Sequence, residues 1–128
     1  MIYYIINPFT REIENFDDEQ YPNAQELAQA KLQEYQQTYL AQEANRFHFA
    51  KVIKTDAGEI WSDGDVNNDP EEGDYHVLNQ YTGLYDAFST LTEVKADIAK
   101  KQQQFLVDCE IDKVFQRVQP VATGLQNA

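Results

Sequence analysis

Two segments of the chain, residues 3–16 and 75–88, follow the same order of residue types, and this internal repeat constrains the fold more than any other feature. Four positions are identical and four more keep their chemical type. The identical pairs are Tyr3/Tyr75, Asn7/Asn79, Thr10/Thr82 and Phe16/Phe88. Chance similarity is not expected to preserve residue type so regularly. The sequence therefore predicts a duplicated unit, or the convergence of two segments on one motif.

Each segment has the pattern of a β-hairpin followed by a helix. A run rich in β-branched and aromatic residues leads into a turn that starts at an asparagine, and a second, shorter run follows. The predicted helices then open with two capping boxes, Asn23 with Glu26 and Thr90 with Glu93. We therefore expect a hairpin-helix unit in each copy.

Apolar residues recur at helical spacing in both predicted helices. The first stripe comprises Ala24, Leu27, Ala28, Leu32, Tyr35 and Tyr39, and the second comprises Leu91, Val94, Ile98, Phe105, Leu106 and Cys109. A helix that follows a hairpin usually buries its apolar stripe on that hairpin. We expect both stripes to be core, rather than a groove for a partner.

The remaining segments differ in pattern. Residues 47–62 are predicted to form a linking hairpin around Asp56-Ala57-Gly58. Residues 110–118 keep helical spacing but on the side opposite the preceding stripe, which predicts a bend near Cys109 and a short third helix. Residues 120–128 lack a periodic apolar pattern and are predicted to be a disordered C-terminal tail.

This element order predicts an α+β fold, a two-layer sandwich in which an antiparallel sheet of about six strands carries two main helices on one face. At 128 residues and 42% hydrophobic content, the chain supports one core. We expect a single α+β domain over residues 1–119, with repeat copies at about 2–44 and 74–109.

The charge balance limits the partners. Against 22 acidic side chains there are only 10 basic ones, giving a net charge of −12 that repels phosphate backbones. The sequence thus favours a protein partner with a basic surface over direct nucleic-acid binding, although an acidic domain could also imitate a nucleic-acid backbone. No apolar run is long enough to span a membrane, and the single cysteine excludes an internal disulfide. We expect a cytoplasmic protein, in the host-cell cytoplasm if it is viral.

Residues 63–74 resemble the calcium loop of EF-hand proteins over twelve residues, because oxygen-bearing side chains recur at the spacing that calcium ligands need. The weak calcium candidates are Asp63, Asp65, Asn67, Asp69 and Asp74. Three departures weaken the match: Asn68 replaces the turn glycine, Pro70 replaces an apolar residue, and Asp74 replaces a bidentate glutamate. A plain solvated loop is the favoured interpretation.

No catalytic constellation stands out in the sequence. His48 and His76 alternate with apolar neighbours and have no cysteine partner nearby, so they make a weak zinc site. There is no glycine-rich phosphate loop and no nucleophile context. We therefore predict a protein that is not an enzyme and needs no cofactor.

The favoured function is a non-enzymatic, acidic protein-protein interaction module, which could also form homo-oligomers. Tyrosine is abundant and suits interfaces, so the candidate contact residues are Tyr4, Tyr81, Tyr85, Glu71 and Glu72. Antitoxin-like immunity proteins, phage-encoded inhibitors and virion assembly factors have a similar profile, and the Asn-x-aromatic-Thr turn resembles the style of tailed-phage accessory proteins. The alternative is a small-ligand or calcium-binding domain that uses the 63–74 loop or a cleft between the repeats.

Overall fold

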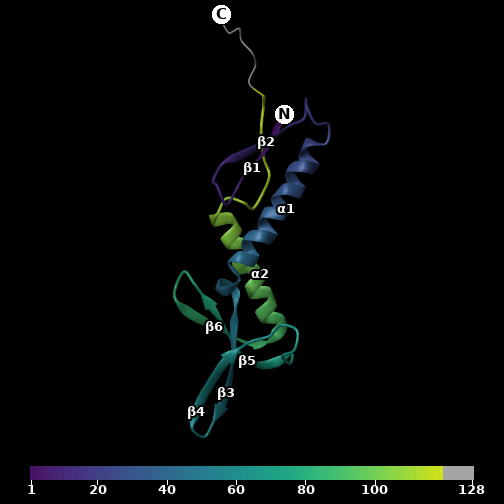
Figure 1. Ribbon diagram of the computed structural model, residues 1–128. Coiled ribbons are helices and arrows are strands. Elements are labelled where there is room, and N and C mark those ends of the chain that lie inside the picture. The colour runs from purple at the N-terminus through teal and green to yellow at the C-terminus, as the bar shows by residue number, and fades with distance from the viewer. Residues whose placement is uncertain (120–128) are drawn as a thin grey trace, which may run out of the picture. The chain divides into compact units, whose positions relative to one another are not determined.

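The computed structural model describes residues 1–119 and shows an α+β chain, which confirms the predicted class (Figure 1). The elements, in order, are β1 (Ile2–Ile6), β2 (Ile13–Asp17), α1 (Ala24–Gln42), the 3-10 turn η1 (Ala44–Phe47), β3 (Phe49–Thr55), β4 (Gly58–Asp63), β5 (Glu72–Asn79), β6 (Leu84–Thr90), α2 (Leu91–Asp108) and β7 (Phe115–Arg117). The strands form two antiparallel sheets, ordered β2-β1-β7 and β4-β3-β5-β6. The single sheet of about six strands is therefore wrong. The predicted tail lies outside the described residues.

The chain divides into two compact units. Among the described residues, unit 1 contains 1–39 and 106–119, and unit 2 contains 40–105. Each unit holds one hairpin of the repeat and most of the helix that follows it. The single domain and the duplication of a whole hairpin-helix unit stay predictions.

Unit 1 is built on β1, which lies between β2 and β7. Its buried residues come from β1, from α1, from the last turn of α2 and from the segment after α2; they are Ile2, Ile5, Ala24, Ala28, Leu32, Leu106 and Ile111. The short third helix predicted for residues 110–118 is wrong, because residues 115–117 form β7 and pair with β1. The ring of Phe115 stacks on Tyr4 there, with centroids 5.3 Å apart. The bend near Cys109 is confirmed, since α2 ends at Asp108.

Unit 2 consists of the four-stranded sheet, η1 and most of α2. Its core cluster joins the sheet to the first turns of α2 and comprises Phe49, Tyr75, Val77, Leu91 and Val94. Strand β3 pairs with β5 only over Phe49–Lys51, whereas its pairing with β4 continues to the turn at Thr55 and Gly58. The outer part of the β3-β4 hairpin is therefore a two-stranded ribbon, which Figure 1 shows extending beyond β5. The linking hairpin predicted for residues 47–62 is confirmed, with its strands at 49–55 and 58–63 and with Phe47 in η1 instead.

The two repeat segments are both hairpins, as predicted, and their identical residues take equivalent places. Tyr3 pairs with Phe16 in the first hairpin, and Tyr75 pairs with Phe88 in the second. The identical residues at the two ends of each segment are thus cross-strand partners. The sequence similarity of the two segments therefore corresponds to the same strand pairing within each hairpin.

The turns of these hairpins repeat the same hydrogen bonds. Asn7 Oδ1 and Asn79 Oδ1 each accept the backbone N–H two residues further on, at 2.9 and 3.0 Å. Thr10 Oγ1 and Thr82 Oγ1 do the same, both at 3.2 Å. Asparagine and threonine side chains stabilise turns in this way because they replace backbone acceptors locally. The turn is therefore specified by these two residue types.

Half of the residues in the two helix stripes are buried. In α1, Ala24, Ala28 and Leu32 are buried, but Leu27 is 36% exposed, so its assignment to the core is wrong. The apolar stripe of α1 is narrower than the sequence pattern, and Leu27 lies at its edge. In α2, Leu91, Val94 and Leu106 are buried, while Ile98, Phe105 and Cys109 are half-buried.

Candidate functional site

An aromatic patch on unit 2 is the candidate site, and we define it as Trp61 of β4, His76 of β5 and Tyr85 of β6. The Trp61 ring lies 4.7 Å from the His76 ring and 5.4 Å from the Tyr85 ring, centroid to centroid. Successive side chains of a strand point to opposite faces of its sheet. Because Tyr75 and Val77 belong to the core, His76 between them faces the other side. The patch thus lies on the sheet face opposite the core.

The patch is exposed although its base is packed. Trp61 and Tyr85 are each 45% exposed. Val52, the cross-strand partner of Trp61, is buried. Large aromatic rings that stay half in solvent while packing on one another form a pre-ordered surface, because little side-chain freedom remains to be lost on binding.

Carboxylates frame the patch. Glu59 and Asp63 lie two residues to either side of Trp61 on β4 and therefore share its face. Asp74 Oδ1 lies 2.8 Å from His76 Nε2, in a hydrogen bond. Lys54, opposite Glu59, is a basic side chain on this face. The rim of the patch is therefore acidic, and it suits a cationic partner group.

The loop between β4 and β5 folds on its own carboxylates. Asp65 Oδ1 accepts the backbone N–H of Asn67 at 2.9 Å, and Asp65 Oδ2 accepts Asn68 Nδ2 at 2.6 Å. Asp69 Oδ2 accepts the backbone N–H of Asp65 at 2.6 Å, while Asp69 Oδ1 accepts Lys51 Nζ at 2.7 Å. The calcium candidates Asp65 and Asp69 therefore lie close together, but their carboxylate oxygens accept hydrogen bonds from groups of the protein.

The pKa directions agree with this arrangement. The Lys51 ammonium lowers the pKa of Asp69, and the Asn68 side chain lowers the pKa of Asp65. The Asp69 side chain is only 5% exposed, so the Lys51 ammonium compensates a carboxylate that is almost withdrawn from water. Lys51 occupies the place at which a cation would contact Asp69.

The other calcium candidates lie at the ends of the loop. Asp63 is the last residue of β4 and Asp74 belongs to β5, so both lie on strands that frame the patch. Asn67 contributes its backbone N–H to Asp65. Among residues 1–119 no group of three His, Cys, Asp or Glu side chains is placed to hold a metal ion.

Both acidic contact candidates, Glu71 and Glu72, are exposed, but Glu71 also has a structural role. The Glu71 carboxylate accepts the backbone N–H and hydroxyl of Thr92, in the first turn of α2, and the Thr92 hydroxyl lowers the pKa of Glu71. Glu71 thus caps the helix. Glu72 pairs with Thr90 at the start of β5 and is exposed.

The three candidate tyrosines do not gather at one site. Tyr85 belongs to the patch, and Tyr81, 64% exposed, lies in the turn of the same hairpin. Tyr4 lies in unit 1, stacked on Phe115 and covered by the Arg117 guanidinium 5.4 Å from its ring centroid. Sequence reasoning missed Trp61 and His76 as parts of a site. The sequence signal for Trp61 was its position between Glu59 and Asp63, two residues from each, which places the three side chains on one face of a strand.

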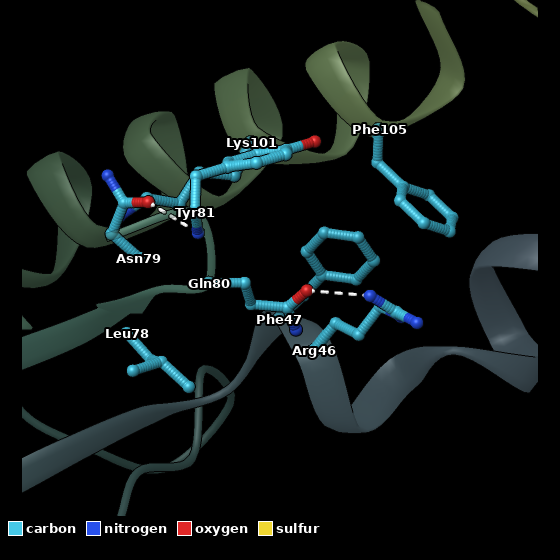
Figure 2. Close-up of a pocket in the computed structure, with 8 residues that line it drawn as sticks. All are labelled: Arg46, Phe47, Leu78, Asn79, Gln80, Tyr81, Lys101 and Phe105. Atoms are coloured by element: carbon cyan, nitrogen blue, oxygen red, sulfur yellow. Dashed lines mark hydrogen bonds between the residues drawn. The ribbon is translucent and has the colours of Figure 1, made fainter. Parts of the chain in front are cut away.

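A small cavity lies beside the turn that carries Tyr81 (Figure 2). Arg46 Nη1 donates to Gln80 Oε1 at 2.9 Å across it, and the Arg46 guanidinium lies over the ring of Phe105. Its volume is about 10 Å³, which holds about one water molecule. The cavity is therefore too small to be a ligand pocket.

In comparisons with known proteins, the chain matches no family model, no curated protein sequence and no solved structure. Among the residues that the structure describes, neither α1 nor α2 is long and apolar enough to cross a lipid bilayer. Any functional conclusion is therefore built from the geometry of the patch and the charge of the chain.

Proposed function

We propose that the chain is a non-enzymatic protein-interaction module that binds a basic protein through the aromatic patch. One observation carries this proposal: Trp61 and Tyr85 are packed together yet 45% exposed, inside a rim of carboxylates. Tryptophan and tyrosine dominate the binding energy of protein interfaces because they bury large areas with few rotatable bonds. An acidic rim selects partners that carry lysine or arginine.

The charge of the whole chain supports the same partner class. A net charge of −12 attracts basic proteins over several ångströms and speeds their association at low salt. At contact, a lysine or arginine side chain can lie over the Trp61 ring while its charge meets Asp63 or Glu59. Accessory, assembly and inhibitor roles, including those of phage-type proteins, all require this kind of binding, and we propose that the chain has such a role.

The test begins with the partner. The tagged full-length chain is used to isolate bound proteins from the native host, which are identified by mass spectrometry, purified and titrated by calorimetry. We expect Trp61→Ala to weaken binding by about 2 kcal/mol or more, roughly thirtyfold in Kd, as truncation of a central interface aromatic does. Tyr85→Ala should weaken it in the same direction.

Tyr21→Ala is the matched control, because Tyr21 is also 45% exposed but belongs to unit 1. Its affinity should equal that of the unmodified chain. Equal losses for Tyr21→Ala and Tyr85→Ala, or a partner with an acidic surface, would contradict the proposal. A partner that DNA displaces in competition would place the chain among nucleic-acid mimics.

A further inference from the structure

The outer edge of β4 offers backbone hydrogen-bonding groups. β4 is an edge strand of the sheet β4-β3-β5-β6. Gly64 N donates to Phe49 O at 2.8 Å, so residues 49 and 64 face each other as a hydrogen-bonded pair. In an antiparallel ladder such pairs alternate with non-hydrogen-bonded ones. From the register, the pairs Ala50/Asp63, Val52/Trp61 and Lys54/Glu59 are the non-hydrogen-bonded ones.

It follows that three residues of β4 direct their backbone N–H and C=O groups away from β3. They are Glu59, Trp61 and Asp63. Their side chains lie on the face of the aromatic patch. The groups that a further strand would need are thus presented beside the patch itself.

This edge is protected against pairing only by the negative charge of Glu59 and Asp63, which does not oppose a basic segment. Exposed edges are otherwise blocked by proline, lysine, a bulge or a covering segment. Residues 58–63 contain no proline and no lysine, all six are exposed, and the β3-β4 register runs without a shift.

The ribbon also carries apolar side chains on both faces. Ile53 and Ile60 are cross-strand partners, 56% and 55% exposed, on the face opposite Trp61. Trp61 and Val52 occupy the other face. A surface that is apolar on both sides of an open edge suits a partner segment that lies along that edge.

We propose that β4 accepts an extended segment of the partner as an added β-strand, with basic and apolar side chains alternating along it. This inference rests on the proposed function and names its binding mode. On the patch face the added side chains lie beside Glu59, Trp61 and Asp63, which suit lysine and arginine. On the other face they lie beside Ile60, which suits apolar residues.

A second copy of this chain is a poorer occupant of the edge. Pairing β4 with β4 would bring Glu59 and Asp63 of both copies together, in molecules that each carry a net charge of −12. A basic segment removes that repulsion and replaces it with attraction. Charge therefore selects the basic occupant.

Two synthetic peptides of identical composition test the mode. One ten-residue peptide alternates lysine with valine, and its isomer collects the same lysines at one end. Fluorescence of Trp61, the one tryptophan of the chain, reports binding directly at the edge. We expect the alternating peptide to bind at least tenfold more tightly, and the amides of Glu59, Trp61 and Asp63 to gain protection in hydrogen exchange by NMR.

Two variants of the full chain isolate the backbone contribution. Glu59→Pro/Asp63→Pro and Glu59→Ala/Asp63→Ala lose the same two carboxylates, but only the proline pair also loses two outward N–H groups. Circular dichroism establishes that both fold. We expect the proline pair to bind the alternating peptide at least tenfold more weakly than the alanine pair.

The outcomes separate the binding mode from the proposed function. Equal binding of the two peptides, equal affinity of the two variants, or no response of Trp61 to either peptide overturns strand addition. A native partner that still depends on Trp61 would then leave the proposed function intact. Light scattering that finds a dimer of the unmodified chain but a monomer of the proline pair would assign the edge to a second copy, which also overturns the proposal.

Discussion

Leu27 and Leu32 provide a matched test of the core, because both are leucines of α1 that differ in burial. Leu32 is 1% exposed and Leu27 is 36% exposed. Replacing either by alanine changes intrinsic helix propensity by the same small amount. The difference between the two variants therefore measures burial.

The structure sets the expected magnitudes. Leu32→Ala removes a fully buried side chain and leaves a cavity, which costs about 2 to 5 kcal/mol of unfolding free energy. Leu27→Ala exposes less apolar area and leaves no enclosed cavity, so its cost is about 1 kcal/mol or less. A domain of this size is usually stable by about 5 to 15 kcal/mol, so the Leu32 variant should remain folded but unfold at clearly lower urea.

Urea unfolding followed by two probes measures these costs and tests the single-domain prediction. Circular dichroism reports α1 and α2, and Trp61 fluorescence reports unit 2 alone. In a single cooperative domain, Leu32→Ala in unit 1 lowers both midpoints together. A shift in circular dichroism without a shift in fluorescence would refute the single domain. Equal costs for Leu27→Ala and Leu32→Ala would refute the burial argument.

Three further predictions follow from the polar contacts. Glu71→Gln should lower the melting temperature because it weakens the cap on Thr92, whereas Glu72→Gln should leave it unchanged; differential scanning calorimetry measures both. Calcium and sodium chloride at matched ionic strength should raise the melting temperature equally, because Lys51 already neutralises Asp69; a larger rise with calcium that Asp69→Asn abolishes would favour the calcium alternative. Burial and the hydrogen bond to Glu14 raise the pKa of Tyr35 from 10.0 to about 12, so the contribution of Tyr35 to stability is complete below pH 10 and is lost as pH rises toward 12. The free energy of unfolding should therefore fall less steeply between pH 10 and 12 in Tyr35→Phe than in the unmodified chain, and an identical pH profile would contradict the assignment.

The hairpins could be predicted because their turns are specified locally. Asn7 and Asn79 bond to N–H groups only two and three residues away, so the residues that fix each turn stand next to one another in the sequence. The capping box of α2 is local in the same sense, with Glu93 N donating to Thr90 Oγ1 at 3.2 Å. Such signals are legible in a single sequence.

The strand β7 could not be predicted, because its cause is remote. Ile111, Val114 and Phe115 have a spacing that suits a helix, and nothing near them in the sequence opposes one. Residues 115–117 are extended because they pair with β1, more than a hundred positions earlier. Leu27 illustrates the same limit at smaller scale, since the width of a buried stripe depends on what packs against the helix.

The candidate site was predicted only in part, because a sequence shows how many carboxylates a segment has but not which of them form hydrogen bonds in the folded chain. In residues 63–74 the fold engages Asp65 and Asp69 within the loop and Glu71 at the start of α2. The carboxylates at the two ends of the loop, Asp63 and Asp74, instead lie on strands of the patch.

The register explains why these two ends meet the aromatic rings. Ala50 of β3 has Asp63 on one side and His76 on the other, and Asp74 is hydrogen-bonded to His76. The central carboxylates of the loop, Asp65 and Asp69, therefore accept hydrogen bonds from the protein itself, whereas the terminal ones, Asp63 and Asp74, lie on the face of Trp61. Because Lys51 already pairs with Asp69, the proposed basic partner would meet Asp63 and Asp74 at the patch, where an exposed ring and an open strand edge can both contact it.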